Sequence, residues 1–159
     1  MLGLTSSGPV QGRAESTVKC GISDAYERIA LRFFDNYQKW CPQVVELEQL
    51  SPPPIELGTK GRQVTRDRGI DSESLFDVTQ FASNAALEIT GSTEPFRSHY
   101  EFINKGNETQ ITFTFELKEI DLVMRPFQKL LKTALQDGAE QTAENIKTLL
   151  ETGKVALYA

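Results

Sequence analysis

The chain has 159 residues, of which 39% are hydrophobic and 25% charged, and this composition is typical of one soluble globular domain. Its formal net charge of −5 disfavours nucleic acid as a partner, because phosphates repel an acidic surface that lacks a strong basic patch. The apolar runs are too short to span a bilayer and no export signal is recognisable, so we expect a cytoplasmic protein without integral membrane association.

The N-terminal part of the chain predicts a strand followed by a helix. Residues 1–13 are rich in Gly, Ser and Thr and are expected to form a flexible segment, whereas residues 14–22 alternate weakly and predict a strand. Ser23 stands where a helix N-cap belongs, with Asp24 and Glu27 in the next turn, where negative charge suits the helix dipole. The spacing of the following apolar residues predicts one face of a short amphipathic helix: Tyr26, Ile29, Ala30, Phe33 and Phe34.

Residues 35–40 predict a second turn or short helix, which ends before Pro42 because the residue preceding a proline disfavours helical dihedral angles. A strand is predicted over residues 43–50, and the prolines within residues 51–54 predict a connection, since proline cannot donate to a strand ladder. Further strands with turn residues between them are then expected over residues 60–68, 73–81, 85–90, 96–104 and 109–117. The short connections favour antiparallel neighbours.

After residue 126 the apolar period changes from two to 3.6, which predicts a helix of about seven turns. Pro126 fits the first helical position and Gly153 the C-terminal cap. A continuous apolar stripe runs along this helix: Phe127, Leu130, Leu131, Ala134, Leu135, Gly138, Thr142, Ile146, Leu149 and Leu150. Because strands and helices do not alternate, the pattern predicts an α+β domain rather than a parallel doubly wound sheet.

The order and spacing of these segments resemble the SRPBCC superfamily (START and polyketide cyclase), in particular its polyketide cyclase/dehydrase-like branch. The resemblance covers residues 14–151 and rests on these runs: SDAYERIALRFFDNYQKWCPQVVELEQL, GTKGRQV, FDVTQF, SHYEF, TQITFTFEL and RPFQKLL. It implies a helix-grip fold, in which a seven-stranded curved antiparallel sheet grips a long C-terminal helix and two short helices follow the first strand. It also implies one domain over residues 14–151 and a C-terminal tail over residues 152–159.

In relatives, the cavity between the sheet and the helix holds lipids, sterols, plant hormones or polyketide intermediates. Strand alternation and the helix stripe supply the residues expected to line such a cavity here: Val64, Arg66, Phe76, Val78, Leu87, Tyr100, Phe102, Phe113, Phe115, Phe127, Leu131 and Leu135. The alternative for each of them is that it fills a solid core. Gly138 either leaves space against the sheet or permits the close approach of a strand.

Polar side chains give few candidates for ligand contacts. The Tyr100 hydroxyl meets either a ligand or, as the alternative, a buried partner or a water molecule. If Val64 points inward, Arg62 and Arg66 do too, and could anchor a ligand carboxylate or phenolate. The alternative is that both arginines reach solvent and pair with neighbouring acidic residues.

For the remaining candidates the sequence favours positions outside a ligand site. His99 lies opposite Tyr100 in the alternation and is expected to face outward, away from any role as a base in the cavity. Trp40 is interpreted as a plug that holds the helical pair against the sheet, with a lid over the cavity mouth as the alternative. Cys20 and Cys41 lack metal-ligand spacing and are expected to be small buried hydrophobes.

No catalytic motif is readable, no catalytic residue is identified, and we expect neither a metal nor a cofactor. The predicted function is the binding of a hydrophobic small molecule (lipid, sterol-like or polyketide/aromatic) in an internal cavity between the sheet and the C-terminal helix. The alternative is an enzyme of the polyketide cyclase, aromatase or dehydratase type that uses the same cavity. A protein-interaction module, as in some relatives, ranks third, and the sequence indicates no protein partner.

Overall fold

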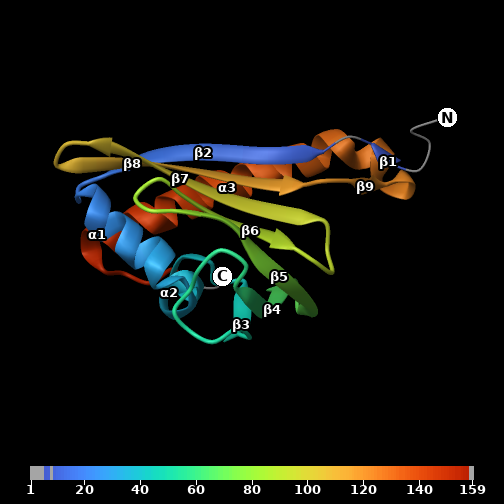
Figure 1. Ribbon diagram of the computed structural model, residues 1–159. Helices are drawn as coiled ribbons and strands as arrows, with labels where there is room; N and C mark the ends of the chain where they lie inside the picture. The colour runs from blue at the N-terminus through green and yellow to red at the C-terminus, as the bar shows by residue number, and fades with distance from the viewer. Residues whose placement is uncertain (1–5, 8, 158–159) are drawn as a thin grey trace.

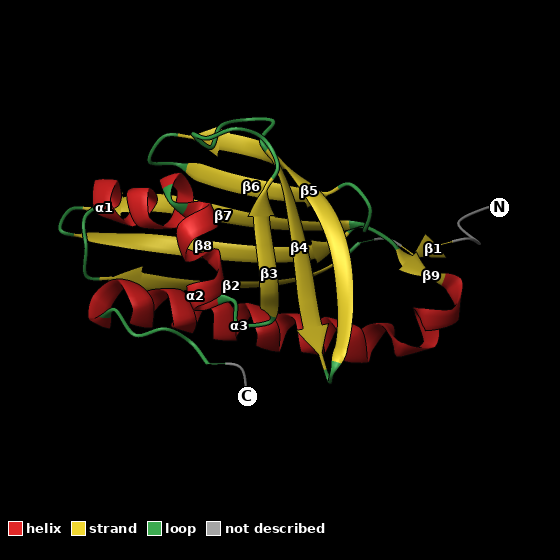
Figure 2. Cartoon of the chain, turned by 90° about the horizontal axis from the view of Figure 1, so that it is seen from below, coloured by secondary structure: helices red, strands yellow, loops and turns green. Residues whose placement is uncertain are grey.

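The computed structural model describes residues 6–7 and 9–157 and shows an open, strongly curved antiparallel sheet (Figures 1 and 2). The seven strands lie in the order β2-β8-β7-β6-β5-β4-β3. Their bounds are β2 Val10–Val18, β3 Val44–Gln49, β4 Lys60–Asp67, β5 Ile70–Ala82, β6 Ala86–Gly91, β7 Phe96–Lys105 and β8 Glu108–Leu117. In Figure 2 strands β3 to β5 run across the direction of β2, β7 and β8, so the sheet wraps around the space beneath it. A separate two-stranded pair joins β1 (Ser6–Ser7) to β9 (Ile120–Asp121).

The helices cover one side of this sheet. The short helices α1 (Ile22–Tyr26) and α2 (Phe33–Trp40) flank a π-helical turn, η1 (Glu27–Leu31), and follow the first long strand as predicted. A 3₁₀ segment, η2 (Leu122–Phe127), leads into the 25-residue helix α3 (Gln128–Thr152), which lies along β2 and β8 (Figure 1). The predicted α+β fold, with a curved seven-stranded sheet around a long C-terminal helix, is therefore confirmed.

Several predicted boundaries are wrong. Strand β2 begins at Val10 and ends at Val18, so residues 10–13 of the expected flexible segment belong to the sheet, while residues 1–5 and 8 lie outside the described residues. The first helix is capped by Gly21 rather than Ser23, because the chain leaves the sheet earlier than the alternation suggested. Pro126 lies inside η2 and α3 starts two residues later, whereas Gly153 caps α3 in the left-handed conformation as expected, with φ of 76°.

The apolar stripe of α3 is only partly buried. The C-terminal half of α3 packs into the core through its five buried residues: Ala139, Ala143, Ile146, Leu149 and Leu150. Phe127 and Leu130, at the other end, are 53% and 70% exposed. Helical periodicity thus identified one face of α3 but did not show where along the helix that face has a partner.

Gly12 on β2 lets the sheet and α3 approach closely. A Cβ at this position would lie 2.1 Å from the carbonyl oxygen of Leu135, which is too short for any side chain. The glycine is therefore required by the contact between β2 and the middle of α3.

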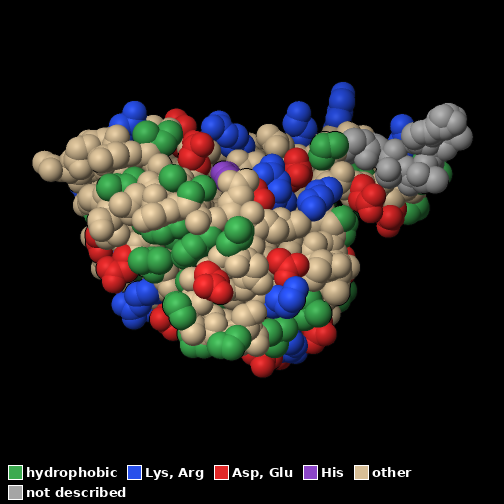
Figure 3. All heavy atoms as spheres, in the orientation of Figure 1, with side chains coloured by type: hydrophobic (Ala, Val, Ile, Leu, Met, Phe, Trp, Pro, Cys, Tyr) green, Lys and Arg blue, Asp and Glu red, His purple; other side chains and the backbone are tan. Residues whose placement is uncertain are grey.

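Two further features concern the apolarity of the helices and the charge of the surface. No helix among the described residues is long and apolar enough to cross a bilayer. Figure 3 shows basic and acidic side chains interspersed over the visible face, without a large area of one sign.

Candidate functional site

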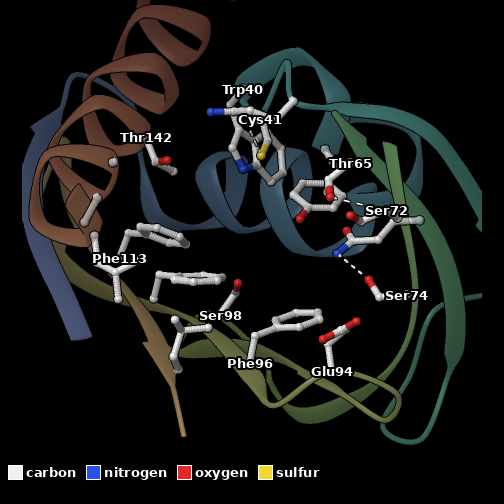
Figure 4. A pocket seen from close by; sticks show the side chains of 18 of the residues that line it. Trp40, Cys41, Thr65, Ser72, Ser74, Glu94, Phe96, Ser98, Phe113 and Thr142 are labelled. Carbon is white, nitrogen blue, oxygen red and sulfur yellow. Dashed lines mark hydrogen bonds between the residues drawn. The ribbon is translucent and has the colours of Figure 1, made fainter. Parts of the chain in front are cut away.

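A cavity of about 450 Å³ lies between the inner face of the sheet and the middle of α3 (Figure 4). Its floor is buried and includes Trp40 and Tyr100, whereas Ser72, Glu94 and Gly138 at its mouth are exposed to solvent. The cavity is therefore open at one side, and its volume lies within the range of about 300–1,000 Å³ that is common for small-molecule sites.

One wall of the cavity is aromatic and aliphatic. Phe96 and Phe115 stack with their ring centroids 6.0 Å apart, and Phe113 lies 5.0 Å from the ring of Tyr100. Leu135 closes this wall from the helix side. These side chains come from β7, β8 and α3, and together they offer ring faces and apolar edges to a ligand.

Small residues on α3 keep the space open. Ala134 and Gly138 line the cavity, and a Cβ built at Gly138 would meet nothing within 4 Å. Of the two interpretations of Gly138, the structure therefore supports the one in which the glycine leaves space. The close approach of a strand takes place instead at Gly12.

The floor is held by a hydrogen bond between two buried aromatic side chains. Trp40 Nε1 donates to the Tyr100 hydroxyl at 3.2 Å, and Asn145 on α3 donates to the Trp40 carbonyl. Burial raises the pKa of Tyr100 well above its ordinary value, so the phenol stays protonated. Trp40 is thus a fully buried plug between α2, the sheet and α3, as predicted, and not a lid.

The lining from β4 and β5 is polar, and Ser98 on β7 adds a hydroxyl between Phe96 and Tyr100. Gln63, Ser74 and Ser98 line the cavity and are 5%, 6% and 3% exposed. Gln63 Nε2 donates to Ser74 Oγ at 3.2 Å, the dashed line that ends at Ser74 in Figure 4. Gln63 Oε1 is buried without a partner, and the Ser98 hydroxyl makes no hydrogen bond within the described part of the chain.

The structure brings four of the twelve expected cavity residues together around this space: Tyr100, Phe113, Phe115 and Leu135. Four others are buried in the solid core: Phe76, Val78, Leu87 and Phe102. Phe127 and Leu131, on the first turns of the C-terminal helical region, lie outside the cavity lining, Phe127 exposed and Leu131 half-buried.

The expected orientation of β4 is wrong. Gln63 and Thr65 line the cavity, so Arg62, Val64 and Arg66 belong to the opposite face of the strand. Arg62 pairs there with Glu73 and Glu46, at 2.7 and 3.3 Å, and Arg66 pairs with Asp71 at 2.7 Å. The alternative interpretation of the arginines, as solvent-facing partners of acidic residues, is the correct one. Val64 was misleading because it is the only large apolar residue of the strand, and it is buried on the face of β4 that points away from the cavity.

The polar wall was missed, although strand alternation contained a signal for two of its members. Ser98 lies between Phe96 and Tyr100 on the same face of β7, and Ser74 shares the face of Phe76 on β5. A prediction based on apolar residues alone does not identify either serine. Gln63 had no such signal, because its strand has no clean apolar face.

Two other chemically distinctive residues lack the environment of a catalytic group. His99 faces away from the cavity, as alternation predicts, with Nδ1 3.0 Å from a carboxylate oxygen of Glu88. Cys41 lines the cavity, but burial raises the pKa of its thiol to about 11, so it is protonated near neutral pH. Cys20 is a free, half-buried cysteine elsewhere in the fold.

The family described as polyketide cyclase / dehydrase and lipid transport matches residues 9–151. A comparison with curated protein sequences gives no match.

Among the solved structures that share the fold, three illustrate the range of similarity. A START superfamily protein from Mycobacterium smegmatis is 13% identical, with a TM-score of 0.72 over 89% of this chain and 97% of that one. An aromatase/cyclase from Streptomyces is 10% identical, with a TM-score of 0.71 over 93% and 99% of the two chains. A protein of unknown function from Staphylococcus aureus is 17% identical, with a TM-score of 0.71 over 93% and 96%. At these identities the likeness concerns the fold alone.

Proposed function

The chain belongs to the polyketide cyclase / dehydrase and lipid transport family, and we propose that it binds a hydrophobic small molecule in the cavity between the sheet and α3. The observation that carries this proposal is the open cavity of about 450 Å³ with a wall of stacked aromatic rings. A ligand that covers these rings removes apolar surface from water on both sides, which contributes about 25 cal/mol per Å².

The cavity supports binding better than catalysis. Its buried polar wall is made of neutral groups, Gln63, Ser74 and Ser98, none of which is a base near neutral pH. Tyr100 and Cys41 are held in their protonated forms by burial, which raises the pKa of both.

The acidic residues of the lining also favour binding over catalysis. Glu73 and Glu94 are the two carboxylates among the described residues that line the cavity. Glu73 is paired with Arg62 on the outside of the strand, and Glu94 is exposed at the mouth. A cyclase or aromatase, the alternative drawn from the Streptomyces relative, would have to work with the Tyr100 phenol as a proton donor and without a buried base.

The binding proposal can be tested by filling the cavity from α3. Gly138→Leu places a side chain into the open space, while Thr133→Leu adds the same side chain to an exposed position of the same helix outside the cavity lining. Fluorescence titration with N-phenyl-1-naphthylamine is expected to show saturable binding to the wild type and to Thr133→Leu. The Gly138→Leu affinity should be at least about tenfold weaker, which corresponds to about 1.4 kcal/mol.

Two results would contradict the proposal: no saturable binding to the wild type, or equal affinities for the wild type and Gly138→Leu. Thermal unfolding of both variants shows whether the fold is retained. Incubation of the wild type with a linear polyketide mimic, followed by mass spectrometry, tests the enzymatic alternative, for which a cyclised product is required.

A further inference from the structure

The 3₁₀ segment η2 and the first turn of α3 form an exposed apolar surface. Of the twelve large hydrophobic side chains that are exposed among the described residues, five fall within nine consecutive positions. They are between 40% and 74% exposed, and together they are named the apolar end: Leu122, Val123, Met124, Phe127 and Leu130. The apolar end lies where η2 and α3 extend beyond the seven-stranded sheet (Figure 2). A cluster of exposed apolar side chains marks a surface that contacts a partner or a membrane.

Basic side chains lie within and beside the apolar end. The stretch between Asp121 and Asp137 contains three basic residues, Arg125, Lys129 and Lys132, and no acidic residue, although the formal net charge of the chain is −5. All three basic residues are exposed, and none of them forms an ion pair with a described residue. Their charge is therefore available to an anionic partner within the Debye length of about 8 Å.

This combination fits an anionic lipid surface better than a second copy of the chain. A symmetric dimer through the apolar end would bring two sets of three basic residues to one interface, where like charges repel. An anionic bilayer instead offers hydrocarbon to the apolar side chains and negatively charged headgroups to Arg125, Lys129 and Lys132.

The apolar end also continues along one helical face to the mouth of the cavity. Phe127, Leu130, Ala134 and Gly138 follow one another at spacings of three and four residues, which places them on the same side of the helix. Ala134 and Gly138 are exposed and line the cavity. A surface that contacts the apolar end therefore meets the same face of α3 that borders the cavity mouth.

We propose that the apolar end docks this protein on the surface of an anionic lipid bilayer. Its apolar side chains insert among the lipids, while Arg125, Lys129 and Lys132 contact the anionic headgroups. This interaction goes beyond ligand binding in the cavity and uses different residues, because no residue of the apolar end lines the cavity.

The test measures co-sedimentation of the protein with two kinds of vesicle, phosphatidylcholine alone and phosphatidylcholine mixed with an equal amount of phosphatidylserine. The wild type is expected to bind the mixed vesicles and to dissociate as the salt concentration rises. Val123→Ser/Leu130→Ser should lower the partition coefficient on mixed vesicles at least about tenfold, because two apolar side chains no longer insert.

Two further double variants separate the apolar and the electrostatic contributions. Leu31→Ser/Leu57→Ser is the matched control, since it changes two side chains that are 50% and 63% exposed on other elements, and it should partition like the wild type. Lys129→Gln/Lys132→Gln should weaken binding to the mixed vesicles about tenfold and leave binding to phosphatidylcholine unchanged. All substituted side chains are exposed, so each variant should retain the fold in thermal unfolding.

Absence of wild-type binding to the mixed vesicles overturns the proposal, and so does binding that Val123→Ser/Leu130→Ser leaves unchanged. A wild-type dimer that this variant dissociates, in sedimentation without lipid and with no vesicle binding, would make the apolar end an interface between two copies instead. Docking and ligand binding fail separately, because the titration with N-phenyl-1-naphthylamine contains no vesicles.

Discussion

The interior has a packed end and a hollow end, and the same sheet covers both. At the packed end, side chains from α1, η1 and α2 meet the C-terminal half of α3 in one buried cluster that includes Tyr26, Ile29, Phe33, Ile146 and Leu149. At the hollow end, the middle of α3 presents small or half-buried residues to the cavity: Ala134, Leu135, Gly138, Ala139 and Thr142.

The difference shows how one fold provides both stability and a binding space. The short helices lie against one end of the sheet only (Figure 2), and they bring the large aromatic side chains that fill it. At the hollow end α3 presents small residues to the cavity, and a Cβ at Gly138 would meet nothing within 4 Å. The packed end should therefore contribute most of the stability, and the hollow end should tolerate changes that a core would not.

The largest effect is expected for Phe33→Ala at the packed end. Phe33 is fully buried and its ring lies 4.5 Å from Tyr37, with further ring contacts to Trp40 and Phe76. Its removal leaves a cavity that the surrounding rings cannot fill, so the free energy of unfolding should fall by about 3–5 kcal/mol in urea titrations.

Phe115→Ala at the hollow end is the matched comparison. Phe115 is half-buried and borders a space that is already open, so its truncation should cost about 1–2 kcal/mol, mainly from lost apolar burial. Equal losses for the two variants would show that the hollow end is packed as tightly as the other.

The second effect concerns the close contact between Gly12 on β2 and Leu135 on α3. Gly12→Ala places a Cβ 2.1 Å from the Leu135 carbonyl oxygen, so either β2 or the helix must move. We expect a loss of about 1–3 kcal/mol in the free energy of unfolding, measured in urea. An unchanged stability would mean that α3 can shift away from the sheet without cost, and that the cavity width is not set at this point.

The third effect compares two buried polar side chains, Glu88 on the outer face and Gln63 in the cavity. Glu88 accepts hydrogen bonds from Thr79 and Arg97 at 2.7 Å and lies 3.0 Å from His99 Nδ1. Burial alone would raise its pKa, but these hydrogen bonds outweigh burial and hold the pKa of Glu88 below the ordinary value of 4.5.

Because the pKa of Glu88 is lower in the folded state, its carboxylate contributes stability above the ordinary pKa, and that contribution is lost as the pH falls through the lowered value. Glu88→Gln should cost about 1–2 kcal/mol near neutral pH and less in acid, as urea titrations at both pH values would show. A cost that does not change with pH would contradict a structural role for the charge. Glu88 is thus paired by the protein, whereas Gln63 Oε1 has no partner among the described residues.

The sequence predicted the sheet well because each strand is bounded by turn residues and β8 alternates cleanly. Ile111, Phe113 and Phe115 face inward as expected, the first into the core and the others onto the cavity. The polar wall was not predictable in the same way, because residues that face a cavity need not be apolar. On β4 the inward residue is Gln63 and the outward one is Val64, the reverse of the usual arrangement.

The apolar stripe of α3 was a poor predictor of the cavity lining for a different reason. Periodicity reports which side chains share a face of α3, but it carries no information about the length of the element opposite them. Leu149 and Leu150 are buried at the packed end, whereas Phe127 and Leu130 are 53% and 70% exposed. Only the three-dimensional path of the sheet determines where the stripe stops being a core and starts to border a cavity.

The smallest effect is a gain, and it tests the hollow end most directly. Gly138 lies inside α3 with helical backbone geometry, and a Cβ there meets nothing within 4 Å. Gly138→Ala therefore adds no clash and restricts the unfolded chain, so the free energy of unfolding should rise by about 0.5–1 kcal/mol in urea titrations. Gly12→Ala introduces the same methyl group at the close β2–α3 contact and should have the opposite sign. A loss of stability in Gly138→Ala would mean that the middle of α3 lies closer to the sheet than the cavity requires, and the hollow end would then be a core with a gap rather than a site that admits a ligand.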